Sequence, residues 1–253
     1  DGFVLKPGFF SADEIRSIRE AVVRLRPTAT VHKNPARKLV VTTPFHAVSQ
    51  CMHSNIRNDV EFLSRVALEC GFREFSKRFY AQNACLDHIV SIESPRCDDP
   101  ITPWHADGGS AAGVGRPDPF TLKFFVFLND IDASAGAFSY LRGTNHPVAV
   151  IRQAIARGEL APFNSGRVPD LVGALHTNEV VDYLLQHMSR QEIDSVVDAL
   201  RAIDGDGAEA EAESLSGVAG TLVAFDDRGI HSGGVARLRD GAVRRDTFGS
   251  TAS

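Results

Sequence analysis

The sequence places its clearest chemical signal at His105 and Asp107, in the stretch TPWHADGG. In an extended segment, residues two positions apart point to the same side. The imidazole and the carboxylate can therefore share one metal ion. A bare H-x-D pair also occurs by chance, as a surface histidine before an Asp-Gly-Gly turn. The metal interpretation thus requires a third ligand from another part of the chain.

His231 is the best placed third ligand among the nine histidines. It lies in TLVAFDDRGIHSGG, after an apolar stretch typical of a strand and before a glycine turn. Two histidines and one carboxylate on one face of a metal leave open positions, an arrangement typical of Fe(II) oxygenases. We therefore predict His105, Asp107 and His231 as catalytic metal ligands. His146, in GTNHP, remains an alternative ligand.

Helical patterns dominate the first part of the chain, about residues 1–80. Ser11 and Glu14 form a capping box before apolar residues at helical spacing, which predicts a helix over about 12–26. A second helix is expected over about 55–69. The basic segment 24–38 between them is interrupted by prolines. It indicates either an exposed charged loop or a lid that clamps an anionic substrate.

Short β-strand patterns follow, separated by turn residues. Strands are expected over 84–94, 121–128, 137–141, 221–225 and 243–248. Residues 148–203 are helical in pattern and lead into an acidic stretch, 204–214. That stretch lacks the full calcium-loop pattern, so a solvated loop is expected. We predict one mainly β domain, 1–253, a jelly roll with N-terminal helices and a helical insertion at about 148–215.

Four further residues are candidates for binding the co-substrate. Strand alternation puts Lys123 on the opposite face from Leu122, so its amine points either into the site or into solvent. Trp104 precedes His105 and either shapes the pocket or is a half-buried aromatic at the barrel mouth. Arg244 and Arg245 follow His231, and one of them can face inward and bind a dicarboxylic acid through its guanidinium group.

The composition excludes several classes of protein. The formal net charge is −5, which argues against a general nucleic-acid surface. No apolar run is long enough to cross a bilayer, and the first residues lack a signal-peptide pattern. The four cysteines form no C-x-x-C pair, which suits reduced thiols. We therefore expect a cytoplasmic protein with no membrane or nucleic-acid partner.

The order of these motifs resembles the phytanoyl-CoA dioxygenase-like family of Fe(II)/2-oxoglutarate-dependent oxygenases. The similar elements are H-x-D, the segment FVFLNDIDASAGAFSYLRGTNH, the segment GTLVAFDD with its distal histidine, and a following arginine. The resemblance extends over about residues 86–248, apart from the helical insertion. The chain has Arg-Gly-Thr-Asn-His where the family has a P-G-S-H segment.

The resemblance implies a double-stranded β-helix, with Fe(II), 2-oxoglutarate and dioxygen as cofactor and co-substrates. It matches His105, Asp107 and His231 to the iron ligands, and Arg244 best to the arginine that binds 2-oxoglutarate, with Arg239 and Arg245 open. Related halogenases have a small residue in place of the carboxylate, so Asp107 favours hydroxylation of a small molecule, anionic or carrier-bound. The competing hypotheses are a cupin-like metal protein without oxygenase chemistry and a nucleic-acid demethylase. Oligomeric state is not indicated.

Overall fold

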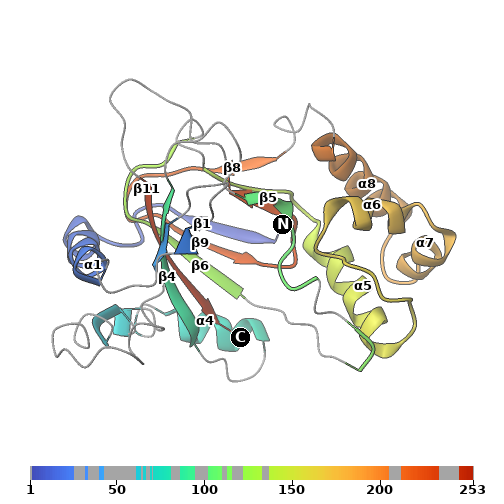
Figure 1. Ribbon diagram of the computed structural model, residues 1–253, viewed down its shortest axis with the longest axis horizontal. Coiled ribbons are helices and arrows are strands. Elements are labelled where there is room, and N and C mark those ends of the chain that lie inside the picture. Colours follow the sequence, from blue (N-terminus) through green and yellow to red (C-terminus); the bar gives the residue numbers. More distant parts are fainter. Residues whose placement is uncertain are drawn as a thin grey trace.

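The computed structural model describes residues 2–25, 32–33, 40–42, 61–63, 65–66, 69, 71–80, 86–94, 102–109, 113–115, 122–132, 137–204, 212–233 and 245–252. Two antiparallel sheets stand at the centre, with helices on either side (Figure 1). The strands are β1 (Phe3–Lys6), β2 (His32–Lys33), β3 (Val40–Thr42), β4 (Leu86–Ser94), β5 (Thr102–His105), β6 (Leu122–Phe127), β7 (Phe138–Tyr140), β8 (Glu213–Leu215), β9 (Leu222–Asp226), β10 (His231–Gly233) and β11 (Arg245–Ala252). The helices are α1 (Ala12–Leu25), α4 (Phe72–Tyr80), α5 (Asn145–Arg157), α6 (Val168–Leu175), α7 (Asn178–Leu184) and α8 (Arg190–Asp204).

The chain passes back and forth between the two sheets. The larger sheet has the order β1-β9-β6-β11-β4-β3-β2, and the smaller has the order β5-β10-β7-β8. From β4 to β7 successive strands alternate between the larger and the smaller sheet, and from β8 to β11 they do so again. This crossing brings β5 next to β10 although they are far apart in sequence. His105 and His231 therefore come from neighbouring strands, and Asp107 lies in the turn that directly follows β5.

The N-terminal region contains strands β1 and β3 as well as helices, and the sequence analysis did not predict these strands. β1 pairs with β9 at one edge of the larger sheet, and β3 pairs with β4 towards the other. A short strand gains its stability from its partner, which lies far away in sequence, so local patterns do not reveal it. Helix α4 also begins directly after Gly71, where the sequence predicted only the end of a helix. The described residues of the predicted 55–69 helix are themselves helical.

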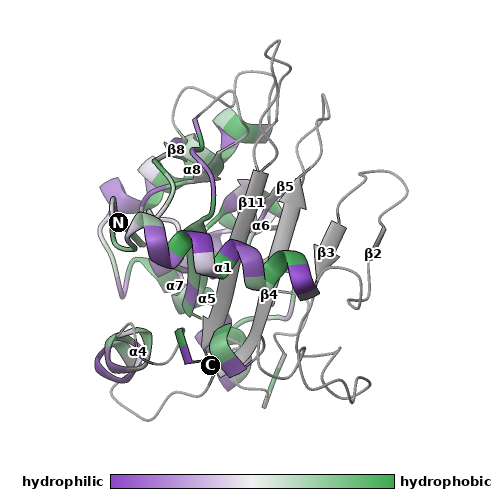
Figure 2. Ribbon diagram, turned by 90° about the vertical axis from the view of Figure 1, so that its left-hand side faces the viewer, coloured by the Kyte–Doolittle hydropathy of each residue, from purple (hydrophilic) through white to green (hydrophobic). Residues whose placement is uncertain are grey.

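One apolar core lies between the larger sheet and the first helices. Ile15, Ile18 and Val22 of α1 are buried, together with Leu122 and Phe124 of β6. Their spacing gives α1 one apolar face, and Figure 2 shows hydrophilic and hydrophobic residues alternating along this helix. Ser11 and Glu14 form the predicted capping box, with Glu14 Oε2 accepting bonds of 2.7 Å from the Ser11 nitrogen and hydroxyl. The burial of Leu122 and Phe124 in this core confirms which face of β6 turns away from the predicted metal ligands.

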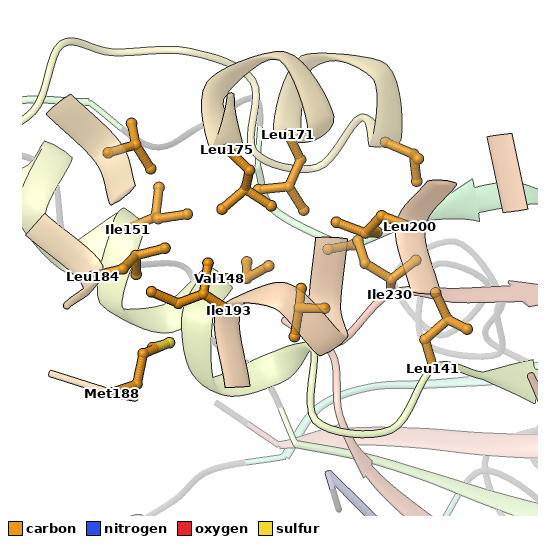
Figure 3. Close-up of a cluster of buried hydrophobic side chains, with 14 of the residues drawn as sticks. Leu141, Val148, Ile151, Leu171, Leu175, Leu184, Met188, Ile193, Leu200 and Ile230 are labelled. Carbon is orange, nitrogen blue, oxygen red and sulfur yellow. The ribbon is translucent and has the colours of Figure 1, made fainter. Parts of the chain in front are cut away.

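Helices α5–α8, residues 145–204, form a second cluster that we call the helical lobe. It lies between β7 and β8 in the chain, as the predicted insertion did. Its apolar core also contains Leu141 and Ile230, which come from the sheet side (Figure 3). Ile230 directly precedes His231. The lobe is thus packed against the segment that carries a predicted metal ligand.

Two predictions concern segments outside the described residues. They are most of the basic stretch 24–38 and most of the acidic stretch 204–214. Within the described part of the chain, no helix is both long and apolar enough to span a membrane.

Candidate metal centre

The structure brings His105, Asp107 and His231 together. One possible ligand atom from each residue lies within 4.8 Å of the others. Nε2 of His105 is 3.5 Å from Oδ1 of Asp107, and Nε2 of His231 is 3.3 Å from Oδ2. Among the described residues this is the only such group of three. Two imidazoles and one carboxylate at this separation suit a divalent transition metal.

Backbone carbonyl groups orient both imidazole rings. Nδ1 of His105 lies 2.7 Å from the carbonyl oxygen of Pro103, and Nδ1 of His231 lies 2.8 Å from that of Gly229. A carbonyl only accepts, so Nδ1 carries the proton and donates it. Nε2 of each ring is then available for a metal, as is usual for histidine ligands. The two ring centroids are 4.5 Å apart.

The glycines after Asp107 let the chain turn away beside the site. Gly108 has φ of 75°, a conformation that glycine adopts without strain. Gly109 packs against Gly166 of the helical lobe, where a Cβ on Gly109 would lie 1.9 Å from the Gly166 nitrogen. The Ala106 nitrogen donates to the Gly166 carbonyl at 3.0 Å. The lobe thus contacts the metal-ligand segment through backbone.

Lys123 points into the site, which resolves the alternative that the sequence left open. Its amine forms an ion pair with Oδ2 of Asp107. Burial alone would raise the pKa of Asp107, but the adjacent imidazoles of His105 and His231 and the charge of Lys123 lower that pKa well below its usual range. Asp107 is therefore an ionised carboxylate, as a metal ligand must be.

The two histidines differ in their electrostatic surroundings. Burial lowers the pKa of His231, and the adjacent Asp107 carboxylate, which favours the protonated ring, only partly offsets this. Burial also lowers the pKa of His105, but the Asp107 carboxylate and the hydrogen bond with the Pro103 carbonyl outweigh burial and raise it. Burial thus favours the neutral form of His231 more than that of His105, and the neutral imidazole is the form that binds a metal.

The other predicted site residues lie outside the metal cluster or outside the described residues. Trp104 is partly buried against the core of the helical lobe, which fits the interpretation as a half-buried aromatic. His146 is exposed at the start of α5 and does not belong to the metal cluster. Arg244 and Arg239 lie outside the described residues, and only the backbone of Arg245 is described, at the start of β11.

Sequence reasoning missed two charged residues near the cluster. Arg167 forms an isolated antiparallel bridge with His105. Asp226 is buried and forms an ion pair with Arg228 in the turn that precedes His231. The DDRG motif shows charges next to an expected strand, but only the structure shows that its two aspartates are buried.

The topology and the cluster define a class of metal-binding protein with two antiparallel sheets and a His-x-Asp…His site. A family model described as Phytanoyl-CoA dioxygenase (PhyH) matches residues 1–237. The chain therefore belongs to the phytanoyl-CoA dioxygenase family of Fe(II)/2-oxoglutarate-dependent oxygenases, as its motifs suggested. No curated protein sequence matches this chain.

Several solved structures share this fold. The non-heme alpha ketoglutarate dependent epimerase SnoN from nogalamycin biosynthesis is 13% identical, with a TM-score of 0.59, over 100% of this chain and 78% of its own. HygX from Streptomyces hygroscopicus, with nickel, 2-oxoglutarate and hygromycin B bound, is 15% identical, with a TM-score of 0.58, over 100% of this chain and 82% of its own. The carbocyclase SnoK from nogalamycin biosynthesis is 15% identical, with a TM-score of 0.59, over 99% of this chain and 79% of its own.

Proposed function

We propose that this chain is an Fe(II)- and 2-oxoglutarate-dependent dioxygenase that hydroxylates, or otherwise oxidises, an unactivated C–H bond of a small molecule. The observation that carries the proposal is the His105–Asp107–His231 cluster in a chain of this family. The alternating strands β4–β11 would form the double-stranded β-helix of one oxygenase domain. The helical lobe would be an insertion in it.

The donor set fits iron(II). Both imidazoles present Nε2, their Nδ1 protons are held by backbone carbonyls, and the carboxylate is ionised. Three protein ligands on one face leave positions for a bidentate oxo acid and for dioxygen. Bound iron would supply the activation of dioxygen, coupled to the conversion of 2-oxoglutarate to succinate and CO2.

The chain's own residues would orient the co-substrate and exclude water. Lys123 is the one described cation in contact with a predicted ligand, and its amine can bind a carboxylate of 2-oxoglutarate once a metal shares the charge of Asp107. Arg244, with Arg239 and Arg245 as alternatives, is proposed to hold the far carboxylate. The helical lobe would limit access of water because it packs directly against the segment after Asp107.

The reaction outcome depends on the substrate that the site holds. SnoN is an epimerase and SnoK a carbocyclase, so this fold serves more than one oxidative outcome. An ionised carboxylate at Asp107 occupies the place where a halide would bind, which favours hydroxylation over halogenation. We therefore place hydroxylation first.

Arg167 supports an anionic or carrier-bound substrate. Directly opposed residues in an antiparallel pair have side chains on the same face. Arg167 opposes His105, so its side chain emerges on the face of the metal ligand. That side chain is 65% exposed, with Asp170 at 3.4 Å. A carboxylate or phosphate of a small molecule can therefore reach its guanidinium group from solvent. We also propose that the protein is located in the cytoplasm and acts without a membrane or nucleic-acid partner.

The test is succinate formation that requires Fe(II), 2-oxoglutarate and dioxygen together. The purified protein should convert 2-oxoglutarate slowly alone and faster with a suitable small molecule. The variant Asp107→Ala should show no turnover above the rate with free iron. An active Asp107→Ala variant would refute the ligand assignment. Metal binding without 2-oxoglutarate turnover would favour a cupin-like protein with other chemistry, and stimulation by DNA or RNA would favour a demethylase.

A further inference from the structure

We propose that Asp226 is a positioning residue for the metal centre. Its ion pair with Arg228 would hold the 226–230 turn, which runs from the last residue of β9 to the residue before β10, in the shape that sets the places of His231 and Asp107. This inference rests on the metal site of the proposed function. It assigns a role to a pair of charges, the buried Asp226 and the partly buried Arg228, that is not among the three predicted ligands.

The 226–230 turn contacts both ligand-bearing segments through its backbone. The Gly229 carbonyl accepts the Nδ1 proton of His231 at 2.8 Å. The Asp227 carbonyl accepts the backbone N–H of Asp107 at 3.0 Å. One turn thus fixes the ring orientation of one ligand and the backbone position of another. A shift of the turn would change both ligands together.

The Asp226 carboxylate is the centre that holds this turn. Oδ1 accepts from the backbone nitrogen and Nε of Arg228, both at 3.0 Å, and Oδ2 accepts from the Arg228 terminal nitrogen at 2.8 Å. Oδ2 also accepts from Nδ2 of Asn145 at 3.1 Å. The side chain of Asp226 is 3% exposed and that of Arg228 15%. Removing Arg228 would leave the buried Asp226 carboxylate without its ionic partner, so this pair strongly prefers its present geometry.

Neighbouring groups leave the turn no room to relax. The Tyr140 hydroxyl donates to the Asp226 carbonyl at 3.0 Å, and its ring lies nearly parallel to that of His231. A Cβ on Gly229 would lie 1.7 Å from the Tyr140 oxygen. The turn is therefore fixed from its carbonyl side as well as from its carboxylate.

The same network connects the metal centre to the helical lobe. Asn145 is the first residue of α5, and the Ile230 N–H donates to the Thr144 hydroxyl at 2.8 Å. Ile230 itself is buried in the core of the lobe (Figure 3). The position of the turn thus depends on the lobe as well as on the sheet.

The experiment measures cobalt(II) binding to the full chain without 2-oxoglutarate. Cobalt(II) reports its ligand geometry in the visible d–d bands, and no turnover is needed. Asp226→Asn preserves shape but removes the charge that Arg228 binds. We expect the Kd for cobalt(II) to rise about 10-fold or more, as for other changes behind metal ligands. We also expect the d–d bands of the saturated protein to change in position or intensity.

The matched control is Glu213→Gln. Glu213 forms an ion pair with Arg142 between the end of β7 and β8, at a more exposed position. This variant should keep the wild-type Kd and spectrum. If Asp226→Asn fails to fold, Arg228→Gln serves instead, because Asp226 then keeps Asn145 as a partner. It should shift Kd and spectrum in the same direction.

The outcomes separate the two hypotheses. A folded Asp226 or Arg228 variant with wild-type affinity and spectrum would overturn the positioning role while leaving the metal site intact. Wild-type protein that binds no cobalt(II) would instead refute the metal site itself. Loss of stability with an unchanged spectrum at saturation would show a merely structural pair, which also contradicts the proposal.

Discussion

Substituting Gly109 with alanine tests how closely the helical lobe must approach the metal-ligand segment. The new Cβ would lie 1.9 Å from the backbone nitrogen of Gly166 and 2.4 Å from its Cα, and ordinary contact begins at 3.4 Å. The two segments would therefore have to separate by 1.5 Å (3.4 minus 1.9). Backbone atoms cannot rotate out of the way as the end of a flexible side chain can.

The magnitude follows from two losses. Overpacking of this kind costs about 1–3 kcal/mol. Separation also breaks the hydrogen bond from the Ala106 nitrogen to the Gly166 carbonyl, which contributes about 1 kcal/mol. The free energy of unfolding should therefore fall by about 2–4 kcal/mol. Asp107 is only two residues away, so metal affinity should fall as well.

Urea unfolding and cobalt(II) titration measure these effects. The matched control is Gly173→Ala in α6, where a Cβ meets nothing within 4 Å. It should stabilise the protein by about 0.5–1 kcal/mol, because alanine favours a helix. A Gly109→Ala variant as stable as the wild type, with unchanged metal affinity, would refute the proposed contact between the lobe and the ligand segment.

Three further predictions concern separate parts of the chain. Lys123→Met should raise the half-saturating concentration of 2-oxoglutarate about 10-fold or more while metal binding persists, because a charged hydrogen bond is lost. This concentration is measured by succinate formation, and an unchanged value would exclude Lys123 from co-substrate binding. Ser11→Ala should lower the free energy of unfolding by about 1 kcal/mol at neutral pH. The hydrogen bonds from Ser11 lower the pKa of Glu14, so the part of this contribution that the Glu14 carboxylate carries is present above the unfolded-state pKa and lost as pH falls through the folded-state pKa. The bond from the Glu14 N–H to the Ser11 hydroxyl remains in acid. Urea unfolding that gives the same difference in acid would contradict this. Leu184→Ala should cost about 2–5 kcal/mol, because Leu184 is fully buried in the lobe, yet a folded sample should bind cobalt(II) with its spectrum unchanged.

Much of the candidate site was predictable from local sequence. His105 and Asp107 lie two apart next to glycines, and His231 stands between an apolar strand and a glycine turn, so each carries its own local signal. The alternating faces of the strand around Lys123 were predictable for the same reason, and the buried Leu122 and Phe124 confirm them. The helical spacing of 148–203 likewise matched α5–α8.

The remaining features depend on contacts between distant parts of the chain. β10 has only three residues and is defined by pairing with β5 and β7. The pairing of Arg167 with His105 depends on how the lobe folds back, which no local pattern encodes. The buried Asp226 accepts a hydrogen bond from Asn145, which lies 81 residues away. Charges in a turn usually face solvent, so no local pattern indicated this burial.

The central claim is that His105, Asp107 and His231 hold an iron(II) ion open to 2-oxoglutarate. The most direct measurement adds Fe(II) and then 2-oxoglutarate to the protein without oxygen and records the visible spectrum. The claim predicts a weak charge-transfer band that requires both additions and is absent from His231→Ala. Iron binding with no band after 2-oxoglutarate, or an unchanged band in His231→Ala, would contradict it.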